Sequence, residues 1–465
     1  MSSLNIRRLS LKGYRCFDAI DIDFDERLTV LIASNGAGKT SILDALAVAF
    51  GPYVGAFDEG MGRHFETSDI RQLRVRATAT NEMEYTPGGI QLEATGWIPD
   101  SIMDRLGEPA VWRRSLAGPV RAKTTIRDAK ELINYGKHLQ EAVRTPKTDV
   151  VLPLVAYYGT GRLWQRKKLT DGKLIGTSRT SGYSDCLNSA SSYKAFVAWF
   201  RYWSTNALKA ELEAHKVRRE PEKTEFHDYI ESVSNAVDTC LKPSNWREIA
   251  YSLAREQLVA HHEQHGELPV ELLSDGIRNM IGMVADIAFR ATKLNPQLGG
   301  YAGRETPGIV LIDEVDMHLH PAWQQVVVQT LLTAFPAMQF IVTTHSPQVL
   351  SAVPAHSIRI LSRHWDEESK KYHSVVEKPS VQTEGIPSAD VLAFAMDTDP
   401  TPNVAPARQL SEYKALIQQD MEESPEALML HRKLLDHFGA AHPVLLECDR
   451  LIRLQRFKRK LPRRD

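Results

Sequence analysis

The sequence predicts an α/β fold in which a phosphate-binding loop joins a buried strand to a helix. The apolar residues 28–33 end where a glycine-rich segment begins, and residues 41–50 then have helical spacing. The apolar runs 309–312 and 340–343 have the continuous hydrophobicity of strands that are buried on both faces of a sheet. Polar side chains follow both runs, and ligands bind at this end of the strands in open α/β sheets.

The glycine-rich segment has the residue types of a P-loop. Gly36 and Gly38 allow backbone N–H groups to face an anion at the N-terminus of the following helix. Lys39 is expected to contact the β- and γ-phosphates, and the Thr40 hydroxyl is expected to hold Mg²⁺. We therefore predict that ATP and Mg²⁺ bind here, with the nucleotide-binding residues Asn35, Gly36, Ala37, Gly38, Lys39, Thr40 and Ser41.

Two adjacent carboxylates follow the apolar run 309–312, and packing does not explain them. Asp313 is expected to hold Mg²⁺ directly or through a water molecule. Because neighbouring strand residues alternate, Glu314 is expected to point elsewhere and to polarise the attacking water as a general base. The pair therefore completes the predicted metal site and adds a catalytic residue.

A histidine follows the third apolar run, which we expect to lie beside the second. His345 is positioned to contact the γ-phosphate and to report its presence to the neighbouring loops. The alternative is a strand-end histidine that is capped by Ser346.

The segments between these motifs predict two further lobes. Strands are expected before the P-loop and in the region 51–155, and they would form an antiparallel β-lobe with one helix over residues 128–143; the expected strands cover residues 6–17, 19–24, 73–80 and 89–97. Two helices over residues 191–215 and 225–241 then predict an inserted helical lobe.

A hairpin is expected over residues 256–270, with His261, His262 and His265 near its turn. Three close histidines suggest a metal, but the spacing and accompanying ligands of a zinc motif are absent, so ordinary surface histidines are favoured.

After Pro379 the composition shifts to helix formers. The last helix carries one apolar face, which would either close onto the rest of the chain or dock a partner; its residues are Val444, Leu445, Cys448, Leu451 and Ile452. Residues 449–465 hold eight basic side chains against two acidic ones. This basic end would contact nucleic acid or an acidic partner, or form a solvated tail.

Composition limits the remaining possibilities. The 465 residues contain 57 basic and 58 acidic side chains, so any nucleic-acid contact must come from local patches. Four scattered cysteines, no long apolar segment and no signal-peptide pattern predict a cytoplasmic protein without a membrane span. The Asp397-Thr398-Asp399 string lies in a proline-rich turn without a preceding buried strand, which disfavours a fused nuclease.

With these motifs in place, the chain resembles the ABC-type ATPase superfamily, on the branch of the Rad50, SMC and RecF proteins. The resemblance rests on the P-loop, on the 311–314 string, on His345 and on a signature string at residues 273–276. It implies an ABC-ATPase head, made of a mixed sheet with a P-loop core plus an antiparallel β-lobe. It also implies that two ATP molecules are held between two heads, with Ser274 and Gly276 acting on the nucleotide of the opposite head. Three positions depart from the family pattern, namely Asp275, Ile277 and His320, and the residue of the Q-loop is not assigned.

The string from Asp313 to Gln324, together with residues 158–162, is similar to the AAA-named ATPases of bacterial anti-phage systems, in particular those of Septu systems and of certain retrons. This similarity implies an oligomeric ATPase that regulates a separately encoded HNH-type nuclease. The alternative is a DNA-repair ATPase of RecF or Rad50 type that binds DNA directly; a transporter subunit is disfavoured because the chain is too long and carries an insertion before the signature.

The expected domain layout follows from these assignments. Residues 1–160 form the N-terminal lobe with the P-loop, and residues 161–300 form the helical lobe with the signature. Residues 301–378 return to the head with Asp313 and His345, and residues 379–465 form a helical region that is available for docking a partner.

Overall fold

The computed structural model describes residues 3–74, 83–99, 101–120, 122–145, 149–163, 178–189, 193–216, 223–367 and 371–460. The chain divides into two compact units, Met1–Met396 and Asp397–Asp465.

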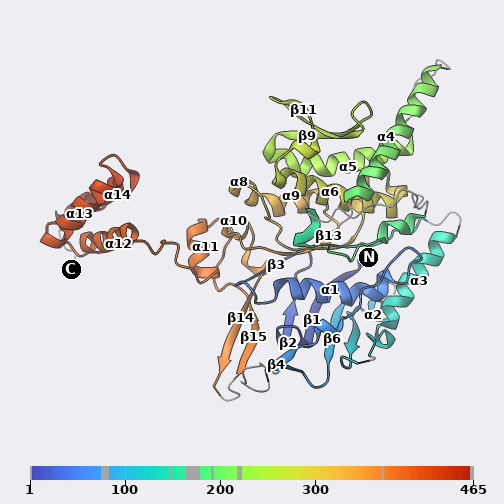
Figure 1. Cartoon of the computed structure of the whole chain (residues 1–465), viewed down its shortest axis with the longest axis horizontal. Helices are drawn as coiled ribbons and strands as arrows, with labels where there is room; N and C mark the ends of the chain where they lie inside the picture. The colour runs from blue at the N-terminus through green and yellow to red at the C-terminus, as the bar shows by residue number, and fades with distance from the viewer. Residues whose placement is uncertain are drawn as a thin grey trace. The chain divides into compact units, whose positions relative to one another are not determined.

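The first unit is organised around a six-stranded sheet that contains the P-loop strand (Figure 1). Five strands are parallel, and the sixth pairs antiparallel at one edge. The order across the sheet is β15 (Lys371–Glu377), β14 (Ile358–Asp366), β3 (Leu28–Ala33), β13 (Met338–Thr343), β12 (Gly308–Ile312) and β8 (Leu154–Tyr158). Every residue of β8, β12 and β13 is buried, as their continuous apolar sequence requires.

A second sheet is antiparallel and has four strands. Its order is β2 (Phe17–Asp23), β1 (Asn5–Tyr14), β6 (Ile90–Trp97) and β7 (Ala110–Leu116). Side chains of β6 and β7 alternate between buried and less buried positions, so one face of this sheet covers the core. A short β4–β5 pair (Gln72–Arg74 and Met83–Tyr85) also occurs; the strand expected over residues 73–80 falls mostly outside the described residues.

The helix that follows the P-loop, α1 (Lys39–Val54), packs between these two sheets and contacts strands of both. Its residues from Ile42 to Val54 are all buried, on every side of the helix. A helix that is apolar all round must lie inside the core. Helices α2 (Ile102–Arg105) and α3 (Lys130–Arg144) accompany this layer, and α3 confirms the helix expected over residues 128–143.

The inserted lobe is helical with a small sheet attached. Helices α4 (Tyr193–Lys216) and α5 (Glu225–Leu241) confirm the two expected helices, and α6 (Asp275–Leu294) packs against both. The expected hairpin is β10 (Gln257–His262) with β11 (Gly266–Pro269), and a third strand, β9 (Trp246–Ser252), completes a sheet that the sequence analysis did not anticipate. Aromatic rings of Trp199, Trp203 and Phe289 join α4 to α6.

Short helices connect the last strands of the first unit. These are α7 (Ala302–Glu305), α8 (Pro321–Gln324), α9 (Val327–Ala334), α10 (Pro347–Leu350) and α11 (Ser388–Ala395). Val391 and Ala395 of α11 belong to the main core, which is why this helix groups with the first unit. The mixed sheet, the antiparallel β-lobe and the inserted helices confirm the predicted α/β head.

The second unit consists of α12 (Ala405–Gln418), α13 (Pro425–Phe438) and α14 (Pro443–Lys460) around its own small core. From the sequence we predicted that the apolar face of the last helix would either close onto the rest of the chain or dock a partner. In the structure this face packs inside the second unit. Leu445 and Cys448 are buried against residues of α12 and α13 such as Tyr413 and Leu434. Sequence alone did not reveal this packing because it depends on apolar faces of three separate helices.

Candidate functional site

The P-loop lies between β3 and α1, with both glycines in the left-handed region. Gly36 has a φ of +77° and Gly38 a φ of +102°. A Cβ atom on Gly38 would also lie 2.4 Å from Cζ of Phe17 and 2.6 Å from Sγ of Cys16. Gly38 is therefore required both by its backbone angle and by the close approach of the β1–β2 turn, whereas Gly36 is required by its backbone angle alone.

Lys39 begins α1 and is buried beside the acidic pair. Its Nζ donates a hydrogen bond to the carbonyl oxygen of Ala33, with a distance of 3.0 Å. Burial lowers the pKa of Lys39, and the nearby charges of Asp313 and Glu314 oppose this shift. Since an ammonium group has three N–H donors, Lys39 retains the capacity to bind further acceptors such as phosphate oxygens.

The residues expected to hold Mg²⁺ come together although they are far apart in the sequence. The Thr40 hydroxyl donates to Oδ2 of Asp313 at 2.8 Å, and the Thr343 hydroxyl donates to Oδ1 of the same carboxylate at 2.6 Å. Asp313 is only 2% exposed. The buried carboxylate of Asp313 and the hydroxyl of Thr40 are oxygen ligands that fit Mg²⁺. Thr40 lies at the start of α1, where backbone N–H groups favour a nucleotide phosphate.

Glu314 lies beyond the end of β12. Its backbone conformation shows that strand alternation, from which we predicted its orientation, does not apply to this residue. The strand ends at Ile312, so alternation along the strand does not set the direction of Glu314. Instead Glu314 has a φ of +49°, and its N–H donates to the Thr343 hydroxyl at 2.8 Å. A left-handed non-glycine residue costs about 1 kcal/mol, and such strain is concentrated at functional sites.

His345 is half-buried directly after β13, between two loops that are joined to each other. The Thr344 hydroxyl donates to Asp316 at 2.5 Å, and the Ser346 hydroxyl donates to Gln324 at 2.8 Å. Ser346 also caps α10, but its hydroxyl forms no hydrogen bond with His345 in the part of the chain that the structure describes. The His345 ring therefore sits where the 316–324 loop and the end of β13 meet.

The signature string forms the start of α6. Ser274 is the N-cap residue, yet its side chain is exposed and does not cap the helix. Gly276 is buried, and a Cβ there would lie 2.4 Å from the carbonyl oxygen of His318. Asn279 donates to the carbonyl of Met317 at 3.2 Å, so the signature packs onto the loop that follows Glu314 in the same chain. Within the described residues Ser274 has no hydrogen bond to the P-loop of its own chain.

A charged network that the sequence analysis missed lies one helical turn beyond Thr40. Asp44 is contacted by Arg15 and by Arg63, each at 2.6 Å, and Arg15 also contacts Asp69 at 2.8 Å. Arg63 in turn stacks on the ring of Tyr157, with 5.5 Å to its centroid. This network fixes the first turns of α1 against β8. The four-residue spacing from Thr40 to Asp44 was visible in the sequence, but the partners were not.

A second missed network joins the signature helix to the end of β8. The Tyr158 hydroxyl donates to Asp286 of α6 at 2.8 Å, and Nε of Arg290 donates to the same carboxylate oxygen at 2.8 Å. The backbone carbonyl of Tyr158 accepts the N–H of Asp313 at 2.8 Å. Tyr158 therefore connects α6, whose first turn is the signature, to the strand end that carries Asp313.

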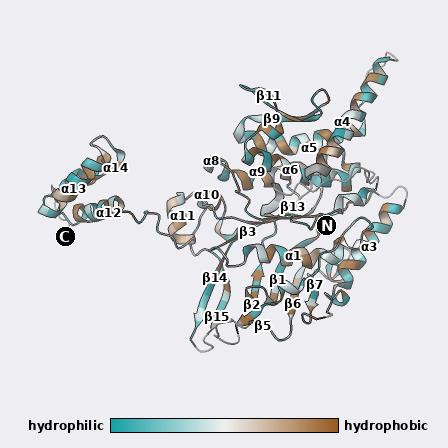
Figure 2. Ribbon diagram, viewed as in Figure 1, coloured by the Kyte–Doolittle hydropathy of each residue, from teal (hydrophilic) through white to brown (hydrophobic). Residues whose placement is uncertain are grey.

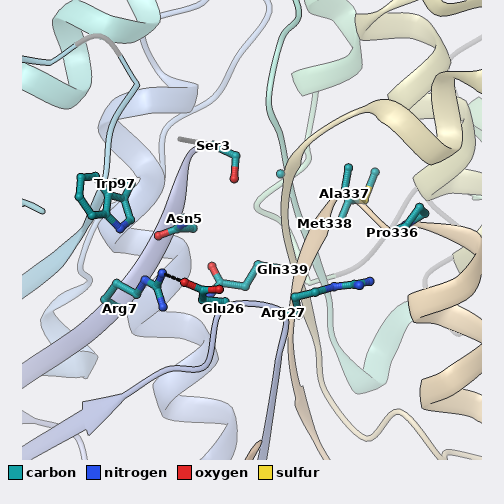
Figure 3. A pocket seen from close by; sticks show the side chains of 11 residues that line it. Ser3, Asn5, Arg7, Glu26, Arg27, Trp97, Pro336, Ala337, Met338 and Gln339 are labelled. Atoms are coloured by element: carbon teal, nitrogen blue, oxygen red, sulfur yellow. Dashed lines mark hydrogen bonds and ion pairs between the residues drawn. The ribbon is translucent and has the colours of Figure 1, made fainter. Parts of the chain in front are cut away.

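A polar pocket of about 470 Å³ lies at the opposite ends of the parallel strands (Figure 3). It includes Gly308 and Met338, the first residues of β12 and β13, so it is separate from the P-loop site. Gln339 closes its floor by joining the two sheets, with its side-chain amide bonded to Ile6 and Asp25. The pocket also contains the Arg7–Glu26 ion pair.

Two of the three histidines of the β10–β11 hairpin, His262 and His265, form ring contacts. His262 lies 4.6 Å from His265 and 4.9 Å from Trp246, measured between ring centroids. Across the described ranges, no group of three or more His, Cys, Asp or Glu side chains is placed to hold a metal ion. Likewise, no described helix has both the length and the apolar content needed to cross a membrane.

Two family models match the chain. An "AAA domain" model matches residues 8–234, and the model described as "AAA domain, putative AbiEii toxin, Type IV TA system" matches residues 191–351. Together with the ABC-type head and the P-loop geometry described above, these matches to AAA-domain models define the chain as an ATPase.

Curated relatives narrow this class. The chain is 24% identical to the Retron Vc95 probable ATPase of Vibrio cholerae serotype O1 biovar El Tor, over 93% of this chain and 88% of that protein. It is 25% identical to the Retron Ec83 probable ATPase of Escherichia coli, over 96% and 86%. A shorter match, 32% identical, covers 37% of this chain and 46% of the Septu protein PtuA of Bacillus thuringiensis. The chain is thus an ATPase whose homologues include retron probable ATPases and the Septu protein PtuA.

Solved structures similar to this fold include an SMC head domain from Thermotoga maritima, 14% identical with a TM-score of 0.42, covering 81% of this chain and 100% of that one. An SMC head bound to the C-winged helix domain of ScpA is 17% identical with a TM-score of 0.45, covering 81% and 98%.

Proposed function

We propose that the chain is the ATP-hydrolysing subunit of a bacterial anti-phage defence complex, that it dimerises by holding ATP between two heads, and that it regulates a separate HNH-type nuclease. The observation that carries the proposal is the 2.8 Å contact between Thr40 and Asp313, with Glu314 immediately beyond it. Matches to retron and Septu ATPases along the chain support the defence role.

In this proposal the P-loop residues Asn35 to Ser41 bind the phosphates, and Thr40 and Asp313 hold Mg²⁺. The metal ion would neutralise charge on the phosphate oxygens. Lys39, which lies near the carboxylates of Asp313 and Glu314, would bind the β- and γ-phosphates. The short contact from Thr343 to Asp313 fixes the carboxylate that binds the metal.

Glu314 is the proposed general base, which would polarise a water molecule near the γ-phosphate; its position beyond the end of β12 and its left-handed backbone support this role. His345 would contact the γ-phosphate, and its position between the 316–324 loop and β13 would transmit loss of that phosphate. The proposal thus assigns both the activation of water and the sensing of the γ-phosphate to side chains of this chain.

The trans role of the signature is supported by the exposure of Ser274. Its hydroxyl is not used to cap α6, and it stands at the N-terminus of a 20-residue helix, where backbone N–H groups favour an anion. Ser274 and Gly276 would then complete the nucleotide site of the opposite head. Asp275 adds a negative charge to this turn and is paired with Arg278, which offsets part of its repulsion toward phosphate.

A RecF-type DNA-binding function is the second candidate. It is favoured by a match that is 38% identical to the DNA replication and repair protein RecF of Mannheimia succiniciproducens, although this match covers only 14% of the chain. Tight duplex binding by the isolated protein, without any associated nuclease, would favour this reading.

The test is the Glu314→Gln variant, compared with Glu305→Gln, whose side chain is exposed on α7. We expect Glu314→Gln to bind ATP and accumulate as an ATP-bound dimer, with steady-state phosphate release reduced about 10²- to 10⁴-fold. Phosphate release and light scattering after size exclusion measure the two effects. Unchanged turnover in Glu314→Gln would remove Glu314 from the mechanism.

A further inference from the structure

The last helix of the second unit has two apolar faces, and only one of them is used within the unit. Leu445 and Cys448 are buried in the small core. Leu446, Leu454 and Phe457 lie on the other side of α14 and are 48%, 49% and 60% exposed. Hydrophobic and hydrophilic residues both occur along this helix (Figure 2). Three large apolar side chains on one exposed face are more than scattered surface residues require.

These three residues are arranged as a continuous stripe. At about 100° per residue, Leu454 and Phe457 lie roughly 80° and 20° from Leu446 around the helix. Along the axis, the 11 positions from Leu446 to Phe457 span about 16 Å. Arg450 and Arg453 are exposed and fall inside the same stripe, at roughly 40° and −20°. We call the surface formed by these five residues the basic-apolar face; its members are Leu446, Arg450, Arg453, Leu454 and Phe457.

Two further arginines near the end of α14 are already engaged within the unit. Arg456 contacts Glu422 and Glu423, and Arg459 contacts Asp420 and Glu422. In these contacts the acidic turn between α12 and α13 neutralises the charges of Arg456 and Arg459.

Arg450 and Arg453 therefore leave positive charge available for another molecule on the basic-apolar face, and the exposed Lys458 lies beside this face on the same helix. Among the described residues, Arg453 donates only to the backbone carbonyl of Asp449, and Arg450 has no ion pair.

We infer that the basic-apolar face docks an acidic amphipathic helix of a second polypeptide. Apolar residues at these helical intervals match the way an amphipathic helix presents anchors at i, i+3, i+4 and i+7. Arg450 and Arg453, placed between the anchors, select carboxylates on the partner.

The same features disfavour the other occupants. A second copy of the same face would bring Arg450 and Arg453 against their own copies across a two-fold axis. Nucleic acid would engage the arginines but would leave three large apolar side chains without a partner. The inference deepens the proposed function and rests on it for the identity of the partner, which would be the nuclease subunit.

The experiment uses the full-length chain and the nuclease subunit encoded in the same operon, produced separately. Binding is measured by fluorescence anisotropy of the labelled nuclease. Two variants change the face, Arg450→Glu/Arg453→Glu and Leu454→Ala/Phe457→Ala. A matched control, Arg432→Glu/Lys433→Glu, reverses two exposed charges on α13. Circular dichroism and ATP turnover check that every variant is folded.

Both face variants are expected to weaken nuclease binding at least 10-fold, with ATP turnover unchanged and the control unaffected. Equal binding by wild type and both face variants would overturn the docking inference while leaving the proposed function intact. Absence of nuclease binding by the wild type would instead overturn the proposed function, and the inference with it.

Two further measurements decide between occupants. If the face variants lost binding to a 30-nucleotide oligothymidine while nuclease binding was unchanged, the face would be a nucleic-acid surface and the inference would be wrong. If they changed only the sedimentation of the chain alone, the face would be a self-association surface, with the same consequence.

Discussion

Tyr158 and Tyr14 offer a matched test of how the Tyr158–Asp286–Arg290 network stabilises the first unit. Both rings are fully buried, and burial raises the pKa of both hydroxyls, so both are protonated at neutral pH. The Tyr158 hydroxyl donates to the buried carboxylate of Asp286 at 2.8 Å, whereas the Tyr14 hydroxyl has no hydrogen-bond partner among the residues that the structure describes. The same Tyr→Phe change therefore removes a charged hydrogen bond at one position and an unpaired hydroxyl at the other.

The expected magnitude follows from these contacts. A hydrogen bond to a charged group contributes about 1.5–3 kcal/mol. Within the described ranges the Oδ1 atom of Asp286 has no partner, so Tyr158→Phe would leave this carboxylate dependent on Arg290. We expect Tyr158→Phe to lower the free energy of unfolding by about 2 kcal/mol, and Tyr14→Phe to leave it unchanged or slightly raised.

Urea denaturation followed by tryptophan fluorescence is a suitable assay because all eight tryptophans precede residue 366, inside the first unit. A double-mutant cycle with Asp286→Asn isolates the contact, and we expect a coupling energy of about 1–2 kcal/mol. Equal midpoints for Tyr158→Phe and Tyr14→Phe, or a coupling energy near zero, would refute the reasoning.

Three further predictions concern the nucleotide site and the inserted lobe. Ser274→Ala should abolish cooperative ATP turnover while binding of a fluorescent ATP analogue persists; loss of binding itself would exclude the trans role. The half-buried Cys16 thiol packs against the P-loop, so ATP should slow its alkylation, as measured by intact mass; equal rates with and without ATP would contradict this packing. Burial lowers the pKa of Lys293 to about 8 despite the opposing charge of Glu225. Between about pH 8 and its unfolded pKa of about 10.4, the unfolded chain binds more protons, so wild-type stability should rise with pH relative to Lys293→Met; a difference that is constant with pH would argue against a shifted lysine.

Much of the first unit could be predicted because its signals are local. The buried strands of the six-stranded sheet are continuous apolar runs, and each ends in polar residues at one edge of the sheet. Parallel pairing brings those ends together, which is how Thr40 and Asp313 come into contact. Thr40 and Asp313, which we predicted from local sequence signals, therefore lie side by side in the fold.

The features that sequence did not reveal depend on contacts between distant segments or on backbone angles. Asp44 is visible on the P-loop helix, but nothing local shows that Arg15 and Arg63 would meet it. The left-handed backbone of Glu314 is set by its bond to Thr343, which lies 29 residues away. Alternation along a strand could not anticipate this conformation because the strand had already ended.

The second unit shows the same limit for helices. Periodicity correctly placed an apolar face on α14, but it could not say that α12 and α13 would cover that face. Leu445 and Cys448 lie on the face that is buried in the unit, whereas Leu446 and Phe457 lie on a second, exposed face. The sequence pattern predicted only one apolar face on this helix.

The enclosure of α1 between two sheets has a consequence for how the protein responds to its ligand. Amide hydrogens of a helix that is surrounded on all sides exchange with solvent only when the whole unit opens. A nucleotide that binds at the start of α1 would therefore contact a helix whose amide hydrogens we expect to exchange slowly. Nucleotide binding should accordingly protect the entire first unit, by about 2.7 kcal/mol at a ligand concentration 100 times Kd, rather than order a single loop.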